Sequence, residues 1–255
     1  MNENQKQTNS EETSHLIEGR NAVLEAFRAG KTVDKLYIQE GLRDGTINTI
    51  LRDAKKRDVI VNYVSREKLD QMSADKKHQG VMAITAAFAY STVEDILAKA
   101  EEKGEPPFLF ILDEIEDPHN LGAIIRTANL CGAHGVIIPK RRAAGLTATA
   151  VKASAGAIHY TPVAKVTNIT KTIEELKSKG LWFACADMGG ELMYKANLTG
   201  PIGLVIGNEG NGVSRLVKES CDYVVSIPMK GDIDSLNASV AAGVLAYEVV
   251  RQRMQ

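Results

Sequence analysis

The stretch from Leu204 to Val250 constrains the fold more than any other part of the chain. It contains two short apolar runs, Leu204–Ile206 and Tyr223–Ile227, separated by one helical segment. Apolar runs of this length are typical of buried strands, and a helix between them is typical of a parallel crossover. Each run leads into a loop, and in parallel α/β sheets the loops at the carboxyl ends of strands hold ligands. The sequence therefore predicts an α/β fold with a ligand site at these two loops.

The first of these loops, residues 207–212, reads Gly-Asn-Glu-Gly-Asn-Gly. Its glycines let the backbone approach a ligand closely, although an ordinary glycine-rich turn has the same composition. The spacing is GxxGxG and no Lys-Ser or Lys-Thr pair follows, so neither a dinucleotide fingerprint nor a P-loop is indicated. The second loop, residues 228–234, closes on Ser235, which is a favoured N-cap for the long apolar helix that follows.

A third segment, Asp117–Ala133, again follows a strand-like run, Phe108–Leu112. The three segments match, in order and in content, the three motifs of the SpoU (TrmH-like) class of SPOUT RNA ribose 2'-O-methyltransferases. The resemblance covers residues 108–255. The residues that carry it are Asn120, Arg126, Gly207, Asn208, Glu209, Gly210, Ile227, Pro228, Ser235, Leu236 and Asn237.

This resemblance implies S-adenosylmethionine as the cofactor, a carboxyl-terminal trefoil knot and a homodimer. It implies a catalytic set made of Arg126, Asn120, Glu209, Ser235 and Asn237. The cofactor-binding residues that it implies are Leu204, Ile206, Gly207, Asn208, Gly210, Ile227, Pro228, Met229, Leu236 and Asn237.

Arg126 is the residue that the resemblance places at the ribose hydroxyl. Arginine side chains stay protonated in proteins, so a role as the proton acceptor is chemically difficult. We therefore expect Arg126 to stay cationic, to clamp the adjacent RNA phosphate and to stabilise the forming alkoxide. A phosphate oxygen or a water molecule would then accept the proton.

Residues 15–88 precede this region and alternate helix and strand. The predicted elements are a helix at Ile17–Ala29, a strand at Lys35–Ile38, a helix at Ile47–Lys56, a strand at Val59–Val64, a helix at Glu67–Met72 and a strand at Val81–Ala86. The opening segment IEGRNAVLEAF and the segment HQGV at His78–Val81 are similar to the amino-terminal domain of the bacterial subgroup that modifies large-subunit rRNA, a domain resembling ribosomal protein L30e. We expect RNA contacts from Arg20, Arg52, Lys55, Lys56 and Arg57, although a generic solvated basic face is also compatible with them.

The rest of the chain completes the predicted organisation. Residues 1–14 are almost free of apolar side chains and are expected to form a disordered tail. Residues 89–107 are expected to be a linker with a short helix, capped by Ser91–Glu94. Residues 108–255 are expected to form the SPOUT domain, with a mostly parallel sheet. Its predicted strands are Phe108–Leu112, Val136–Ile138, Trp182–Ala186, Leu204–Ile206 and Tyr223–Ile227.

Charge distribution favours a nucleic-acid partner, even though the net charge is only −1. No Asp or Glu occurs from Pro118 to Ile173, whereas seven Lys and Arg residues do. Local positive charge of this kind suits phosphate contacts. The expected RNA-binding residues in this stretch are Lys140, Arg141, Arg142 and Lys152, and a solvated loop is the alternative for the first three.

Other compositional signals narrow the function classes. Three widely spaced cysteines argue against a disulfide framework and a zinc site, so no metal is expected. No apolar run reaches the length of a membrane span, and no signal peptide is recognisable, so we expect a cytoplasmic protein. The final helix, predicted at Asn237–Arg251, is apolar on more than one side, which favours packing against a second subunit.

We expect the protein to methylate a guanosine ribose 2'-oxygen in large-subunit (23S) rRNA with S-adenosylmethionine. A tRNA guanosine 2'-O-methyltransferase or a resistance-type rRNA methyltransferase of the same fold is an alternative. A noncatalytic RNA-binding protein of ribosome assembly is an alternative from another class, although it predicts the loss of a motif residue and none is lost.

Overall fold

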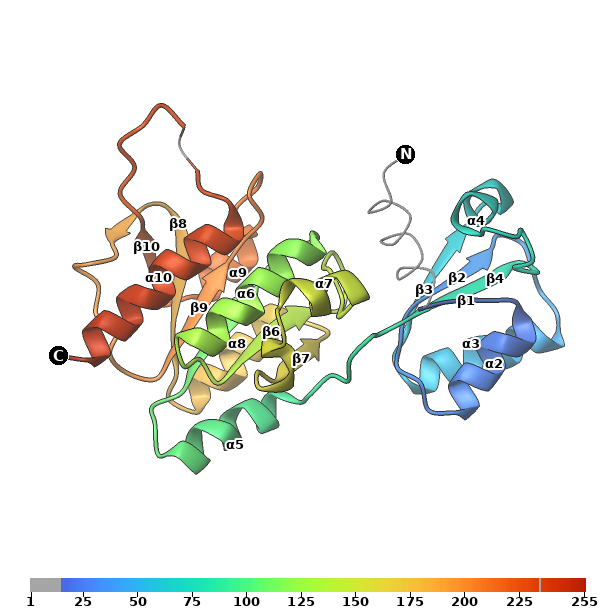
Figure 1. Ribbon diagram of the computed structural model, residues 1–255, viewed down its shortest axis with the longest axis horizontal. Coiled ribbons are helices and arrows are strands. Elements are labelled where there is room, and N and C mark those ends of the chain that lie inside the picture. The colour runs from blue at the N-terminus through green and yellow to red at the C-terminus, as the bar shows by residue number, and fades with distance from the viewer. Residues whose placement is uncertain (1–14, 234) are drawn as a thin grey trace. The chain divides into compact units, whose positions relative to one another are not determined.

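The computed structural model describes residues 15–233 and 235–255, so the tail predicted for residues 1–14 lies outside the described residues. The chain divides into two compact units (Figure 1). Unit 1 contains the described residues up to Ala89 together with Gly145–Thr149, and unit 2 contains Tyr90–Ala144 and Ala150–Gln255. Each unit is described below by itself.

Unit 1 is a four-stranded sheet with helices packed against it. The strand order is β1-β4-β2-β3, with β2 and β3 parallel and β4 antiparallel to both β1 and β2. The elements are β1 (Leu16–Glu18), α2 (Arg20–Arg28), β2 (Val33–Gln39), α3 (Gly45–Lys56), β3 (Ile60–Val64), α4 (Arg66–Met72) and β4 (Val81–Thr85).

Local sequence explains where these helices begin. The Asp44 carboxylate caps α3 by accepting hydrogen bonds from the backbone N–H groups of Thr46 and Ile47, both at 3.0 Å. The helix predicted from Ile17 is wrong at its start, because residues 16–18 pair with β4 instead. Gly19 then turns the chain with a φ of 91°, a conformation that favours glycine.

Unit 2 is built on a six-stranded parallel sheet with the order β10-β8-β9-β5-β6-β7. This sheet confirms the predicted α/β class. Its strands are β5 (Phe108–Leu112), β6 (Gly135–Pro139), β7 (Val163–Val166), β8 (Trp182–Leu192), β9 (Ile202–Ile206) and β10 (Tyr223–Ser226). Its helices are α5 (Val93–Lys103), α6 (Pro118–Leu130), α7 (Ala148–Ala153), α8 (Ile169–Ser178), α9 (Arg215–Ser220) and α10 (Ala238–Arg253), with a short 3-10 turn at Ala157–His159.

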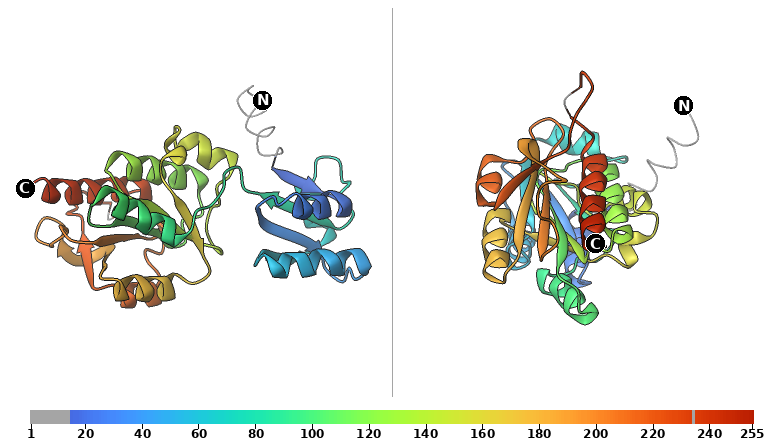
Figure 2. Two further views of the ribbon diagram at one scale, coloured as in Figure 1. Left: turned by 90° about the horizontal axis from the view of Figure 1, so that it is seen from below. Right: turned by 90° about the vertical axis from the view of Figure 1, so that its left-hand side faces the viewer.

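Helices cover both faces of this sheet (Figure 2). Helices α6 and α10 lie side by side on one face, and α8 and α9 lie on the other. The central strands are buried on both sides, as in most parallel sheets; all five residues of β5 and all five of β9 are buried. The knot implied by the resemblance stays a prediction.

Three details of unit 2 differ from the sequence-based expectations. Strand β7 was missed because it is only four residues long and includes Lys165. The capping box of α5 joins Thr92 to Asp95, through hydrogen bonds of 2.7 and 3.1 Å, and is not the predicted Ser91–Glu94 box. Helix α5 also packs on β6 and β7 through the buried Ile96, so it belongs to the body of unit 2 and is not part of a free linker.

The start of α10 also differs. Asn237 is its N-cap, and its Oδ1 atom accepts hydrogen bonds from the backbone N–H groups of Ser239 at 2.9 Å and Val240 at 3.3 Å. The interpretation of Ser235 as the N-cap is therefore wrong. Among the described residues, no helix has both the length and the hydropathy that crossing a membrane requires.

Candidate functional site

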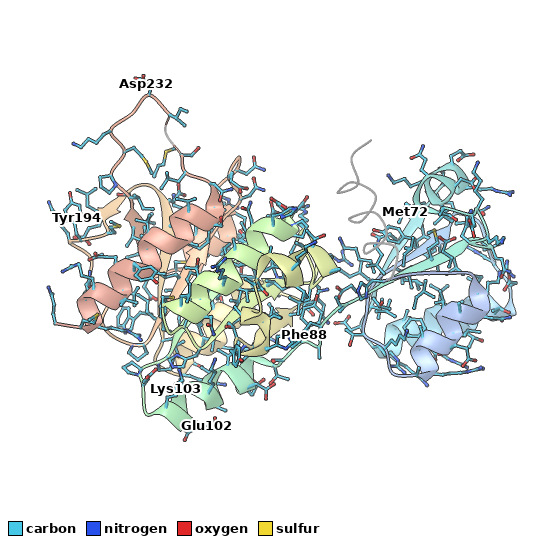
Figure 3. The ribbon with its side chains drawn as sticks, viewed as in Figure 1. Met72, Phe88, Glu102, Lys103, Tyr194 and Asp232 are labelled. Carbon is cyan, nitrogen blue, oxygen red and sulfur yellow. The ribbon has the colours of Figure 1, made fainter. Side chains whose placement is uncertain are left out.

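A cavity of about 370 Å³ lies at the carboxyl ends of β9 and β10 and beside the middle of β8. Its walls are formed by four segments. They are residues 186–188 of β8, the 207–212 loop, the end of β10 with the loop that follows it, and the start of α10. Asp232 lies at the tip of that last loop (Figure 3). The lining residues are Ala186, Asp187, Met188, Ile206, Gly207, Asn208, Glu209, Gly210, Asn211, Gly212, Val225, Ser226, Ile227, Met229, Ser235, Leu236, Ala238, Ala241 and Leu245.

Gly207 is required by the close approach of two backbone segments. A Cβ atom at this position would lie 2.2–2.3 Å from the backbone of Gly212 and Val213. Asn208 and Gly212 close the loop with two backbone hydrogen bonds, of 3.1 and 2.8 Å. The Asn208 side chain stiffens it further, because its Oδ1 accepts from the Gly210 N–H at 2.8 Å and its Nδ2 donates to the Glu114 carbonyl at 3.2 Å.

Three polar side chains from the three sequence motifs form one hydrogen-bonded network beside the cavity. Asn120 Nδ2 donates to Glu209 Oε1, and Asn237 Nδ2 donates both to Asn120 Oδ1 at 3.0 Å and to Glu209 Oε1 at 3.2 Å. The backbone N–H of Ala238 also points at Glu209 Oε1, at 3.4 Å. A single carboxylate oxygen thus joins α6, the glycine loop and α10.

The two helices that supply the asparagines run in the same direction. Asn120 contacts Asn237 near the two helix starts, and Thr127 lies beside Gly243 further along. Both amino-terminal ends therefore lie at the same edge of the sheet, and helix amino termini carry partial positive charge. The site combines these two helix ends with one buried and hydrogen-bonded amide, that of Asn120, which is 7 % exposed.

Two residues expected at this site have free side chains. Arg126 is exposed and has no hydrogen bond or ion pair with any other described residue. Ser235 is exposed, lines the cavity and is likewise without a hydrogen bond to the described part of the chain. Of the two, Ser235 lines the cavity and Arg126 does not. Neither side chain would have to break an internal interaction to contact a ligand.

The residues expected to bind cofactor divide into two groups. Ile206, Gly207, Asn208, Gly210, Ile227, Met229 and Leu236 line the cavity. Leu204, Pro228 and Asn237 do not line it; Leu204 is fully buried in β9, and Asn237 belongs to the adjoining network. Sequence reasoning missed Ala186, Asp187 and Met188, which no motif marks. They lie inside β8, just beyond the residues of β8 that pair with β9.

The cysteines lie outside this chemistry. Cys131 and Cys185 are buried and Cys221 is half-buried, and all three are free thiols. Burial raises the pKa of Cys131 to about 11, and a hydrogen bond with Cys221 raises the pKa of Cys185. Thiols with raised pKa values are poor nucleophiles. No cluster of His, Cys, Asp or Glu within residues 15–233 and 235–255 could hold a metal ion.

One of the expected RNA-binding residues of unit 2, Arg142, is connected to the glycine loop. Arg142 pairs with Glu114 at 2.9 Å, and the Glu114 carbonyl accepts from Asn208. That ion pair therefore connects the loop of residues 140–142 to the cavity wall. Arg141 and Lys152 are exposed, and Lys140 is half-buried.

In unit 1 the expected residues separate into two surfaces. Arg52, Lys55 and Lys56 are exposed on α3, whereas Arg57 donates to the Phe27 carbonyl at 2.5 Å and lies over the Phe27 ring, which gives it a structural role. Arg20 lies elsewhere, in a hollow of about 640 Å³. The lining residues of that hollow are Arg20, Gln39, Leu42, Arg66, Lys76, Lys77, His78, Gln79 and Gly80.

Comparison with known protein families gives a consistent result for both units. Residues 107–247 match the SpoU rRNA Methylase family, and residues 16–91 match the family described as RNA 2'-O ribose methyltransferase substrate binding. The chain belongs to the SpoU (TrmH-like) family of RNA 2'-O-ribose methyltransferases. This membership agrees with the order of the three motifs that meet in the network.

Individual SpoU relatives cover most of the chain. YacO of Bacillus subtilis, named as a TrmH family tRNA/rRNA methyltransferase, is 49 % identical over 246 residues, which are 96 % of this chain and 98 % of YacO. The SpoU methyltransferase AviRb of Streptomyces viridochromogenes, solved with the cofactor AdoMet, is 28 % identical with a TM-score of 0.59, over 94 % of this chain and 90 % of AviRb. The A. aeolicus TrmH/SpoU tRNA modifying enzyme is 29 % identical with a TM-score of 0.54, over 59 % of this chain and 77 % of its own.

Proposed function

We propose that this SpoU protein methylates a guanosine ribose 2'-oxygen in 23S rRNA, using S-adenosylmethionine bound in the cavity beside Gly207. The observation that carries the proposal is the network of Asn120, Glu209 and Asn237, which joins all three family motifs at the wall of that cavity. When bound, S-adenosylmethionine supplies an electrophilic methyl group on a sulfonium, so that transfer to the 2'-oxygen leaves S-adenosylhomocysteine and releases the hydroxyl proton.

The cavity has the size and chemistry that this cofactor needs. Its volume of about 370 Å³ lies within the range of roughly 300–1,000 Å³ for small-molecule sites. Three glycines, Gly207, Gly210 and Gly212, line it, and glycine lets a ligand approach the backbone closely. The only ionisable side chains among the described lining residues are Asp187 and Glu209, and both are acidic. An acidic cavity suits a ligand that carries a sulfonium and an ammonium group.

The chain's own residues would act chiefly by positioning and electrostatics. Glu209 accepts hydrogen bonds from Asn120, Asn237 and the Ala238 backbone, so the wall of the site is held rigid before any ligand arrives. The amino termini of α6 and α10 place partial positive charge where the alkoxide forms. Arg126, exposed and without an internal partner, would clamp the RNA phosphate beside the reacting ribose.

The choice of rRNA rests on unit 1. Residues 16–91 match a substrate-binding family, and the tRNA modifying enzyme of A. aeolicus covers only 59 % of this chain. We propose that the hollow lined by Arg20, Arg66, Lys76 and Lys77 contacts the rRNA phosphates. A tRNA or a resistance-type rRNA substrate remains the alternative within the same chemistry.

The deciding experiment is methyl transfer from tritiated S-adenosylmethionine to purified 23S rRNA, 16S rRNA and tRNA. Label in a ribose of 23S rRNA alone supports the proposal, and mapping of the 2'-O-methyl group identifies the nucleotide. Label in tRNA alone would replace rRNA by tRNA as the substrate. Cofactor binding without transfer to any RNA would favour a noncatalytic RNA-binding role.

The two basic surfaces of unit 1 can be compared with matched variants. Arg66→Glu with Lys76→Glu changes the hollow, and Lys55→Glu with Lys56→Glu changes α3 by the same charge. We expect the first pair to raise the KM for rRNA at least about tenfold and the second pair to change it less, because only the hollow concentrates cations around a cavity. An equal rise in the KM for rRNA in both pairs would contradict the proposal that the hollow binds rRNA.

The homodimer is part of the same proposal. Helices α6 and α10 pack together and expose Leu130, Val240 and Tyr247, which are 64, 49 and 53 % exposed. Large apolar side chains on one pair of helices are typical of an interface with a second subunit. Leu245 and Val249, in contrast, are fully buried within the chain's own core.

A further inference from the structure

A second carboxylate at the cavity, that of Asp187, is not part of any sequence motif. Strand β8 pairs in register with β10 as far as Cys185, and the register shifts before Glu191. Residues 186–190 lie in this irregular stretch. Gly189 has a φ of 76°, and a Cβ atom on Gly190 would lie 2.5 Å from the Val224 carbonyl oxygen. The backbone around Asp187 is therefore built in a conformation that two glycines make possible.

The Asp187 side chain is held from two sides. Lys218 Nζ donates to Oδ2 at 2.6 Å, and the Met188 backbone N–H donates to Oδ1 at 2.7 Å. The hydrogen bond with Asp187 raises the pKa of Lys218. A carboxylate has about four lone-pair positions, so each oxygen can still accept a bond from a ligand. The side chain is 24 % exposed and lines the cavity, which leaves it accessible.

Asp187 differs in this respect from Glu209, the other acidic lining residue. Glu209 Oε1 already accepts from Asn120, Asn237 and Ala238, and it faces the motif network. Asp187 lies on the β8 side of the cavity. The one side chain that binds it among the described residues is Lys218, which does not line the cavity. Lys218 thus fixes the direction of the carboxylate without occupying the cavity.

We propose that Asp187 is a cofactor-binding residue that accepts a hydrogen bond from a donor group of S-adenosylmethionine, and that Lys218 is its positioning residue. This inference rests on the proposed function, because it takes the cavity to be the cofactor site. The donor is a ribose hydroxyl or the ammonium of the amino-acid end. The sulfonium is a second positive group of the ligand, and it is not a hydrogen-bond donor.

Three ligands that differ by one group each locate the contact. The dissociation constants of S-adenosylmethionine, S-adenosylhomocysteine and 5'-methylthioadenosine are measured by calorimetry for the full chain and for Asp187→Asn. We expect a weakening of about 10- to 100-fold, as for a hydrogen bond to a charged group. Equal loss for all three places the contact on the adenosine part that they share, as expected for a ribose hydroxyl, and loss for the first two alone identifies the ammonium. Loss for S-adenosylmethionine alone would overturn the hydrogen bond, because the sulfonium has no donor.

Two further variants separate binding from folding. Lys218→Met keeps the Asp187 carboxylate but removes the lysine that holds it. We expect it to weaken the binding of the same ligands as Asp187→Asn does, by a smaller factor. Asp222→Asn is the matched control: Asp222 pairs with Lys177 at 2.7 Å and accepts from the Phe183 N–H, but it does not line the cavity. We expect wild-type affinity for that control at an unchanged Tm.

The outcomes distinguish this inference from the proposed function. If the wild-type chain binds none of the three ligands, the cofactor assignment itself fails. If the wild type binds S-adenosylmethionine and Asp187→Asn binds all three ligands as tightly, the role of Asp187 is overturned. If Lys218→Met retains wild-type affinities while Asp187→Asn does not, the positioning role of Lys218 is overturned alone.

Discussion

Asn237 Nδ2 lies 3.0 Å from Asn120 Oδ1, although 117 positions separate the two asparagines in the chain. Both amides also donate to Glu209 Oε1, so the three side chains form a closed set of hydrogen bonds. The set depends on one acceptor atom. Its removal gives the sharpest test of how the site is held together.

Glu209→Ala leaves the donors of Asn120, Asn237 and Ala238 without their acceptor. We expect the free energy of unfolding to fall by about 1–3 kcal/mol and methyl transfer to fall at least about 100-fold. Urea unfolding and single-turnover methylation measure the two effects. Glu219→Ala is the control, since Glu219 pairs with Arg215 on an exposed face of α9 and should matter little. Near-normal transfer by Glu209→Ala would contradict the positioning role of the network.

Gly207→Ala forces a Cβ atom into the backbone of Gly212 and Val213, so the glycine loop must move. We expect S-adenosylmethionine binding to weaken at least about tenfold, because overpacking typically costs about 1–3 kcal/mol. Gly231→Ala is the matched control, since a Cβ atom there meets nothing within 4 Å. Calorimetric titration of both variants tests this, and equal affinities would show that the loop tolerates the shift.

Arg126 distinguishes two catalytic roles. If Arg126 clamps the RNA phosphate, Arg126→Lys keeps the charge but loses the bidentate hydrogen bonds of the guanidinium. We therefore expect weak residual activity. Arg126→Ala should lose nearly all activity while cofactor binding survives, since the side chain has no partner among the described residues. Rates at several pH values decide the mechanism. A Lys variant whose rate rises in step with ammonium deprotonation would show that this side chain acts as a base.

Helix α10 offers a comparison between core and surface. Leu245→Glu places a charge at a fully buried position, so we expect the chain to unfold or to lose about 3 kcal/mol or more. Tyr247→Glu changes an exposed position and should keep the fold while it dissociates the proposed dimer. Sedimentation and circular dichroism measure these effects. A wild-type chain that sediments as a monomer would remove the dimer proposal.

His134 predicts a pH dependence of stability. Its ring is buried, the Phe108 N–H donates to Nδ1 at 3.0 Å, and Nε2 lies 3.1 Å from Glu105. Burial lowers its pKa below the ordinary value of about 6.5. The unfolded chain therefore binds the proton first, and the stability contributed by His134 is complete above about pH 6.5 and is lost as the pH falls towards the lowered pKa. Urea unfolding between pH 8 and pH 5 should show this decline, and His134→Asn should reduce it.

The elements that the sequence predicts well are those with strong local signals. The strand Phe108–Leu112 has the predicted bounds because five consecutive apolar residues follow a Pro-Pro break. The parallel sheet is confirmed because apolar runs and helices alternate along the whole second unit. The three motif segments are also found together, as strand carboxyl ends in one parallel sheet must be.

The features that sequence reasoning missed depend on tertiary pairing. Strand β1 is three residues long and exists only through its register with β4. The bulge at residues 186–190 arises where the register of the β8–β10 pairing shifts. Asp187 lies in this bulge and lines the cavity, but no sequence motif indicates either fact. In the sequence, Arg57 is the last residue of a basic run and was expected to bind RNA. In the structure it binds the carbonyl of Phe27, which lies 30 positions earlier in the chain. Leu245 and Val249 face the chain's own core because α6 and β9 are both packed against α10.

The carboxyl-terminal turns of α10 hold distant parts of unit 2 together. Gln252 binds the Met193 and Ala196 carbonyls and the Leu198 N–H, and Arg253 donates to the carbonyls of Pro106, Pro107 and Gly200. The same helix is capped by Asn237, so the ribosome synthesises it after every other element of the site. On the ribosome, unit 1 can complete its core while the cavity is still open. The chain can therefore fold unit 1, which matches the substrate-binding family, before it is able to hold cofactor.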